Sequence, residues 1–298
     1  MKNIKKFDYT ETLGWSISRY EKFLNCKRQY FYDYYSKFDD EIPYEKIQFL
    51  KNLTSKPLEI GNIVHDIMKS IFKRYQKNIK PINKDKFFQY SLKITKEHCH
   101  SKIFFEHYYN GEIILPLKIY EKIKKILENF LNSKRFVWIT KNAISKNDEW
   151  IIEPDGFGEF RIKNYKAFCK VDLLLPALNN IYIIDWKTGK PNKKKHSKQL
   201  TGYAFWASYH FKKKSNNIIP IAAYLYPKYE EKNIEIFDDS ITEFENIVVR
   251  EIEDMYKYLT NIEKNIPKNK ESFHFTGNII SCKYCNYKEI CYNKNKIK

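Results

Sequence analysis

Apolar side chains recur at helical spacing through the first 135 residues of the chain. The clearest case is the segment 58–75, where apolar positions three or four residues apart form one face of an amphipathic helix. That face contains Ile63, Val64, Ile67, Met68, Ile71 and Phe72. Aromatic residues recur at similar spacing over 15–37, which Ser16 or Ser18 can cap. Two further helical patterns follow, near 84–108 and 116–133.

From about residue 136 the apolar pattern becomes that of β-strands. Short runs of β-branched and aromatic residues are separated by Asn, Asp and Gly. The predicted strands are 136–144, 149–153, 159–162, 166–176, 180–187, 217–227 and 233–238. Helices are predicted over 195–213 and 241–264. With no internal repeat or flexible linker, this order predicts one α/β domain: a mixed sheet with a helical segment inserted early.

The composition narrows the class of protein. Aromatic residues make up 17% of the chain, which excludes a disordered composition. No apolar run reaches the length of a membrane span, and the first 15 residues lack the apolar stretch of a secretion signal. We therefore expect a soluble, cytoplasmic protein that makes no use of a membrane.

The net charge of +18 changes the picture by favouring a polyanionic partner. Nucleic acid is the first candidate and a membrane surface the second. The basic residues are widely spread, with short runs at 193–195 and 212–214. Because Lys, Asn, Ile and Tyr are abundant together, as an AT-rich genome would give, charge alone does not decide for nucleic acid.

Candidate chemistry begins at the end of the strand 180–187, where Asp185-Trp186-Lys187 follows an apolar run. Residues i and i+2 share one face of a strand, so Asp185 and Lys187 point the same way. Asp172 lies 13 residues earlier, inside another apolar run. Neighbouring strands can bring the two carboxylates together, where they repel unless a cation lies between them. Oxygen ligands suit Mg²⁺ or Mn²⁺, and the alternative is a pair of ordinary strand-end residues.

Three polar residues on predicted helices extend this set. Gln199 and Tyr203, at i and i+4, face one direction on the helix after the Asp-x-Lys strand. They could hold a phosphate backbone or an ordered water, or be a polar residue beside a packed aromatic. His65 lies at the edge of the apolar face of 58–75. It becomes a candidate ligand only if that helix packs over the two aspartates.

The ordered series Gly61-x-x-x-His65, Asp172, Asp185-x-Lys187 and Gln199-x-x-x-Tyr203 resembles the RecB-like branch of the PD-(D/E)XK nucleases, which are metal-dependent DNA nucleases. The resemblance implies a restriction-endonuclease-like mixed sheet flanked by helices. It also implies a Mg²⁺ or Mn²⁺ ion on His65, Asp172, Asp185 and the carbonyl of Trp186. Lys187 would help to activate water, while Gln199 and Tyr203 would steady the DNA strand and the active site.

The sequence departs from this family pattern at two places. Cys169 occupies a position where the family often has Gly, and Glu153 matches an acidic family position only loosely. Neither departure removes a metal ligand, so we expect an active enzyme.

The chain has six cysteines, and a cytoplasmic location argues against disulfides. Cys26, Cys282, Cys285 and Cys291 resemble the iron–sulfur subgroup, which includes the AddB nuclease domain and CRISPR-associated RecB-like exonucleases. Four thiolates suit a [4Fe–4S] cluster or, by count, a structural Zn²⁺. The distant first cysteine favours the cluster, although Lys27 replaces the Pro that often follows it. Cys99 and Cys169 are predicted to be ordinary buried thiols.

We therefore predict one nuclease domain over 1–298. It would comprise a helical insertion (58–135), a nuclease core (136–265) and an iron–sulfur region (15–37 with 270–298). The expected activity is metal-dependent hydrolysis of DNA, as an exonuclease on single strands or ends, in repair, recombination or CRISPR adaptation. No G-x-x-x-x-G-K-[ST] motif is present, so unwinding would require a helicase partner. CRISPR adaptation proteins are alternative partners, and an oligomer is compatible with the sequence.

Two other functions were weighed against this one. The first is a non-catalytic iron–sulfur DNA-binding module of a larger repair complex. The second is a zinc-stabilised RNA-binding protein, which leaves Asp172, Asp185 and Lys187 without a role.

Overall fold

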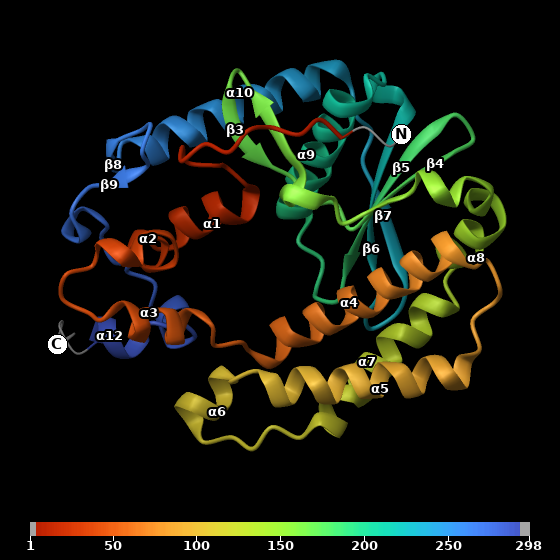
Figure 1. Cartoon of the computed structure of the whole chain (residues 1–298), viewed down its shortest axis with the longest axis horizontal. Coiled ribbons are helices and arrows are strands. Elements are labelled where there is room, and N and C mark those ends of the chain that lie inside the picture. Colours follow the sequence, from red (N-terminus) through yellow and green to blue (C-terminus); the bar gives the residue numbers. More distant parts are fainter. Residues whose placement is uncertain (1–3, 293–298) are drawn as a thin grey trace.

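A central five-stranded mixed sheet organises the computed structural model, which describes residues 4–292. The strand order is β1 (Ile151–Ile152), β4 (Leu173–Ala177), β5 (Asn180–Lys187), β6 (Ile218–Tyr224) and β7 (Glu230–Asn233). β5 and β6 are parallel and joined by α9 (Lys193–Phe211), whereas the other pairs are antiparallel. The predicted fold class, a mixed α/β sheet flanked by helices, is confirmed (Figure 1).

Helices cover both faces of this sheet (Figure 1). One face packs against α4 (Lys56–Lys77), α5 (Lys84–Ser101) and α7 (Pro116–Leu131). The other packs against α1 (Ile17–Asn25), α2 (Lys27–Tyr35), α9 and α10 (Asp238–Tyr256). Along β5, Ile181 and Ile183 belong to the second cluster while Ile184 and Trp186 belong to the first, as the two-residue period of a strand requires.

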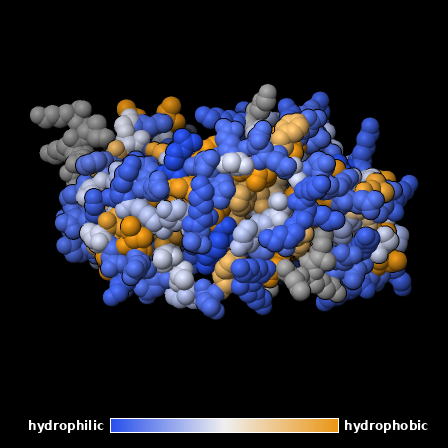
Figure 2. Space-filling view, turned by 90° about the horizontal axis from the view of Figure 1, so that it is seen from above, coloured by the Kyte–Doolittle hydropathy of each residue, from blue (hydrophilic) through white to orange (hydrophobic). Residues whose placement is uncertain are grey.

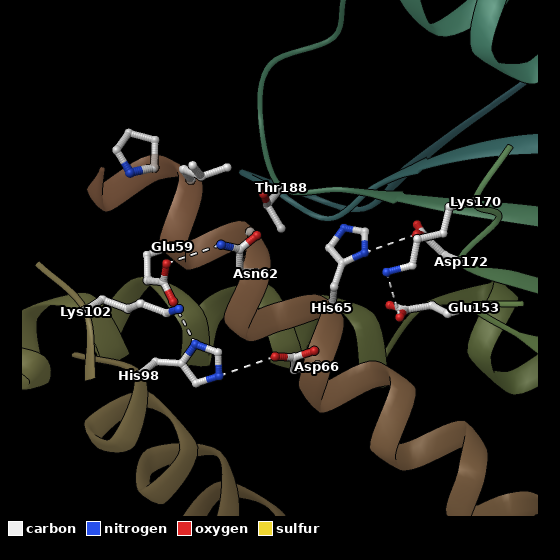
Figure 3. A pocket seen from close by; sticks show the side chains of 13 residues that line it. Glu59, Asn62, His65, Asp66, His98, Lys102, Glu153, Lys170, Asp172 and Thr188 are labelled. Carbon is white, nitrogen blue, oxygen red and sulfur yellow. Dashed lines mark hydrogen bonds and ion pairs between the residues drawn. The ribbon is translucent and has the colours of Figure 1, made fainter. Parts of the chain in front are cut away.

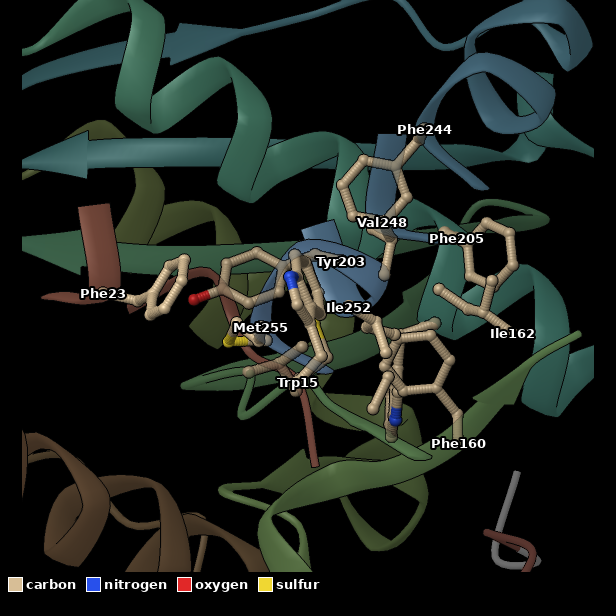
Figure 4. Packing of buried hydrophobic residues seen from close by; sticks show 14 of the residues in the cluster. Trp15, Phe23, Phe160, Ile162, Tyr203, Phe205, Phe244, Val248, Ile252 and Met255 are labelled. Atoms are coloured by element: carbon tan, nitrogen blue, oxygen red, sulfur yellow. The ribbon is translucent and has the colours of Figure 1, made fainter. Parts of the chain in front are cut away.

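The aromatic content fills the cluster on the α9 side (Figure 4). Trp15 is 1% exposed and packs edge-to-face on Phe244 from α10. Its indole N–H donates to Glu251, so the one polar atom of the ring is satisfied inside the core. The outer surface seen from above is mostly hydrophilic, with apolar side chains grouped near its middle (Figure 2).

The remaining elements are short. They are α3 (Tyr44–Lys51), α6 (Phe105–Asn110), α8 (Lys134–Trp138), β2 (Glu159–Ile162), β3 (Tyr165–Phe168), β8 (Leu259–Asn261), β9 (Ile266–Pro267), α11 (Ile279–Lys283) and α12 (Lys288–Tyr292). Strands β2 and β3 form a separate hairpin, and β8 and β9 form another. In the part of the chain that is described, no helix is long and apolar enough to cross a membrane.

The strand predicted over 136–144 is wrong, because this segment is helical. It forms the end of α8 and a following π-helical turn, Ile139–Ala143. The Ser133 hydroxyl caps α8 by accepting the N–H of Phe136. Phe136, Ile139 and Ala143 are buried at helical spacing, so burial on one helix face prevailed over the strand preference of the β-branched and aromatic residues.

Three other boundaries differ from the prediction. The run 166–176 is divided between β3 and β4, which lie in different sheets. The strand predicted over 233–238 lies earlier, as β7. The helix predicted over 15–37 is interrupted at Cys26, whose extended backbone (φ −159°) ends α1 and begins α2.

The N-terminal helices and the C-terminal segment pack against each other (Figure 1). The Arg28 side chain donates to the Phe273 carbonyl, and the Tyr287 hydroxyl donates to Asp33. Lys270, 5% exposed, forms 2.8 Å ion pairs with Asp39 and Glu41. These buried polar contacts fix the two ends of the described chain to one another.

Candidate active site

The register of β4 on β5 places the two predicted aspartates together. Leu173 is opposite Ile184, so Asp172, immediately before β4, lies across from Asp185. The Trp186 N–H donates to Asp172 Oδ2 over 2.8 Å and locks this arrangement. Because the Trp186 ring packs against Phe72 on the α4 side, Asp185 and Lys187 point to the α9 side.

His65 reaches this site because the apolar face of α4 is buried against the sheet. Its Nδ1 lies 3.2 Å from Asp172 Oδ1, and its Nε2 donates to the Trp186 carbonyl over 3.0 Å. Glu153 joins them, and its backbone N–H donates to the Asp172 carbonyl. One donor atom from each of His65, Glu153 and Asp172 lies within 4.8 Å of the other two (Figure 3).

Asp185 is held by a network of side chains from α9. Tyr203 donates its hydroxyl to Asp185 Oδ1 over 2.8 Å, and Gln199 donates to both Asp185 Oδ1 and the Tyr203 hydroxyl. Lys187 donates to Gln199 over 2.7 Å and lies 2.5 Å from Asp185 Oδ2. The structure therefore brings together all the residues predicted around the Asp-x-Lys strand.

The charges of these buried groups are unevenly distributed. Burial and the neighbouring Asp172 carboxylate raise the pKa of Asp185 to about 6, despite the opposing effects of Lys187 and Tyr203. Burial would also raise the pKa of Asp172, but His65 and the Trp186 N–H outweigh it and lower this pKa. Burial lowers the pKa of His65, yet the Asp172 charge prevails and raises it to about 9.

A divalent cation fits this donor set. Buried Asp185 Oδ2 has no well-aligned hydrogen bond, although Lys187 is close. The oxygens of Asp172 and Glu153, the Trp186 carbonyl and the His65 imidazole provide the hard and borderline ligands that Mg²⁺ or Mn²⁺ accept. A metal bound to His65 would displace its proton, so binding should release protons.

The metal-ligand candidates line a pocket of about 570 Å³ that runs along α4 (Figure 3). At its far end His98 is held between Glu59 and Asp66, with Nδ1 2.7 Å from Glu59. Lys170 and Lys69 neutralise Glu153 at 2.9 and 2.6 Å and, against the effect of burial, lower its pKa. A substrate can therefore approach the aspartates through solvent-accessible space.

Glu153 is the site residue that sequence reasoning ranked too low. It follows the two-residue strand β1 and has a positive φ of 45°, so no strand periodicity marks it. Conversely, Asp185, predicted as a ligand, is outside the close group of three and serves Tyr203, Gln199 and Lys187. Its role as a ligand stays a prediction.

The four cysteines predicted as cluster ligands lie in one region. Cys26 is at the α1–α2 junction, and the Ser281 hydroxyl, next to Cys282, donates to Asn25. Burial, with added effects from Cys26 and Cys282, raises the pKa of Cys285 to about 11. Burial and the other three thiols raise the pKa of Cys291 to about 12. These thiols are close enough to interact electrostatically, but no three described thiols lie within 4.8 Å of one another.

The remaining two cysteines, Cys99 and Cys169, are buried free thiols, as predicted.

The sequence profile of the PD-(D/E)XK nuclease superfamily matches residues 14–292. The chain belongs to this superfamily. Nucleases of the PD-(D/E)XK superfamily typically use Mg²⁺ or Mn²⁺, and the group of His65, Glu153 and Asp172 could hold such an ion. No curated protein matches the chain.

Two solved structures are similar to this superfamily member. One, from Eubacterium rectale, is provisionally described as an exonuclease and has 13% sequence identity and a TM-score of 0.44. That match covers 89% of this chain and 90% of the other. The second, SSO0001, has 19% identity and a TM-score of 0.31, and covers 70% of this chain and 96% of the other.

Proposed function

We propose that the protein is a metal-dependent deoxyribonuclease that hydrolyses phosphodiester bonds. The observation that supports this best is the convergence of His65, Glu153 and Asp172 on one pocket, beside Asp185 and Lys187. The net charge of +18 suits a polyanionic substrate. A structural iron–sulfur module alone would have no use for this buried and electrostatically costly group of carboxylates.

Each residue has a task in this proposal. His65, Asp172 and Asp185, with the Trp186 carbonyl and Glu153, would hold Mg²⁺ or Mn²⁺. When bound, the ion would supply a water of lowered pKa and a positive charge beside the phosphate.

Lys187 would face the same phosphate and stabilise the charge that develops on it. Gln199 and Tyr203 fix the orientation of the Asp185 carboxylate through hydrogen bonds, so the site is preorganised.

The finer substrate assignment is an exonuclease that acts on single strands or DNA ends. Exposed aromatic and basic side chains would favour unpaired bases over a closed duplex. Repair, recombination and CRISPR adaptation are the processes in which such an activity is used, with a helicase or adaptation proteins as partners. We retain the helical insertion over 58–135, the core over 136–265 and the iron–sulfur region as the proposed organisation.

We also propose that Cys26, Cys282, Cys285 and Cys291 hold a [4Fe–4S] cluster with a structural role. The raised pKa values of Cys285 and Cys291 support this, because thiols that lie together in a buried region become thiolates only with a metal counter-charge. The cluster would close a loop of more than 250 residues between the α1–α2 junction and the C-terminal segment.

The proposed activity is tested on end-labelled single- and double-stranded DNA with Mg²⁺, Mn²⁺ or EDTA. Lys187→Ala should lower kcat by about 100-fold or more, because it removes charge stabilisation in the transition state. Lys232→Ala, on the exposed part of edge strand β7, is the matched control and should retain activity. Absence of cleavage by folded, metal-loaded wild type would favour the DNA-binding module instead.

The proposed cluster is tested by iron analysis and visible absorbance of anaerobically purified protein. Cys26→Ala should lose the absorbance and lower the melting temperature, whereas Cys99→Ala, at a buried thiol on α5, should keep the absorbance. Zinc in place of iron would support the structural-zinc alternative. Unchanged absorbance and melting in Cys26→Ala would show that this residue is not a ligand.

A further inference from the structure

A second pocket, of about 690 Å³, lies on the other side of the catalytic residues. Its walls include Lys187, Gln199 and Tyr203 from the active site, and Arg19 and Tyr34 from the N-terminal helices. Lys170 lines both this pocket and the one that contains His65 and Asp172. The two pockets therefore meet at the active site, and a strand with its scissile phosphate at the aspartates would continue into the second pocket.

The charges around the second pocket are not equally available to a ligand. Lys187 pairs with Asp185, Lys170 with Glu153 and Lys195 with Glu21, at distances of 2.5, 2.9 and 2.8 Å. Arg19 also lines the pocket, but it has no carboxylate partner among residues 4–292. It is thus the cation there whose charge is least compensated by the protein.

Arg19 is nevertheless held firmly. Its Nη1 donates to the Gly14 carbonyl over 3.0 Å, and its Nε donates to the Tyr30 hydroxyl over 3.3 Å. The guanidinium carbon lies 4.1 Å from the centre of the Tyr34 ring. These contacts use two of the five guanidinium N–H donors, so donors remain for an anion and little side-chain freedom would be lost on binding.

We propose that Arg19, positioned by Tyr34, binds the phosphate of a linkage neighbouring the scissile one in the DNA strand. This inference rests on the proposed nuclease function and adds to it a phosphodiester-binding subsite on the N-terminal helices. A guanidinium suits a phosphate because it can donate two parallel hydrogen bonds to its oxygens. Such a contact fixes the register of the strand on the metal site without reading sequence.

The proposal predicts dependence on one particular phosphate. Single-stranded, end-labelled oligonucleotides are prepared with one neutral methylphosphonate linkage, placed at successive positions. For the wild type, one position flanking the cleaved bond should lower kcat/KM by about 10- to 100-fold, the range of a charge-assisted hydrogen bond. Arg19→Gln should lose a similar factor on unmodified DNA and lose little more from that linkage.

Arg74→Gln is the matched control. Arg74 lies on α4, stacks on Tyr75 at 5.3 Å and donates to the carbonyls of Lys80 and Pro81, away from both pockets. It should leave the methylphosphonate profile unchanged. Arg19→Lys keeps the charge and guards against misfolding of the Gln variant, and it should show a weaker loss at the same linkage.

Binding measured by anisotropy with Ca²⁺ separates this inference from the proposed activity. If wild type binds without cleaving, but shows the one-linkage dependence and loses it in Arg19→Gln, the subsite stands and the nuclease proposal fails. If wild type cleaves and both folded Arg19 variants keep the full methylphosphonate effect, the subsite is refuted while the nuclease proposal survives.

Discussion

Replacing Asp185 by Asn should stabilise the metal-free protein while removing its activity. Asp185 is 3% exposed, and burial and the Asp172 charge raise its pKa to about 6. In the unfolded chain its pKa returns to about 3.9. The difference, about 2.1 pH units at 1.36 kcal/mol each, means that ionised Asp185 costs the folded state about 3 kcal/mol at pH 8.

The net gain should be smaller than this ceiling. In Asp185→Asn the amide oxygen can still accept from Tyr203, and Lys187 keeps Gln199 as its acceptor, but Lys187 loses its carboxylate. A pair with so little exposure is worth about 1–2 kcal/mol after this loss. We therefore expect the variant to gain about 1–2 kcal/mol in the free energy of unfolding at pH 8 in EDTA.

The dependence on pH has a definite sign. Because the folded-state pKa of Asp185 is raised, the folded protein is favoured below pH 4, where the carboxyl is protonated in both states, and this advantage is lost as pH rises through about 6. The gain from Asp185→Asn should thus be about half as large at pH 5 as at pH 8. Urea denaturation in EDTA at both pH values measures it.

Two controls make the test decisive. Asp254→Asn, at a half-exposed carboxylate paired with Lys257, should change stability little at either pH. Millimolar Mn²⁺ should raise the melting temperature of wild type and have a smaller effect on Asp185→Asn. A loss of stability that is equal at pH 5 and pH 8 would refute the view that the folded protein strains this carboxylate.

Two further predictions concern stability. Lys270→Met should destabilise the protein by about 3–5 kcal/mol in urea, because it leaves the buried Asp39 carboxylate unpaired, whereas Lys257→Met at an exposed pair should cost under about 1 kcal/mol; equal effects would contradict this. Gly158→Ala should cost more than about 2 kcal/mol, because Gly158 has φ +65° and a Cβ there would clash with the Cys169 carbonyl. Gly111→Ala, with φ +66° and no atom within 4 Å, should show only the smaller backbone term, and a loss as large as that of Gly158→Ala would rule out the clash.

Local sequence patterns predicted the parts of the site that lie on regular elements. β5 has an apolar run with a two-residue period, which placed Asp185 and Lys187 on one face, and α4 has an apolar face that placed His65 at its edge. The sheet and most helices followed from the same periodicities. These features are local, so one segment of sequence contains the information needed.

The residues that were missed depend on contacts between distant segments. Glu153 enters the site through the pairing of β1 with β4 and a backbone turn of positive φ, neither of which has a sequence period. Arg19 faces the active site only because α1 packs beside α9. The segment 136–144 failed for a related reason, since its β-branched and aromatic residues suit a strand until tertiary packing favours a helix.

The alternation along β5 has a consequence for how this enzyme can change over time. Trp186 belongs to the hydrophobic layer against α4, and its neighbours Asp185 and Lys187 belong to the active site. A shift of one residue within 181–187 would move the tryptophan into the polar pocket and both charges into the apolar layer. Insertions or deletions there would therefore destroy fold and chemistry together. New lengths are expected to be tolerated in the loop after Lys187, where substrate preference can evolve independently of the core.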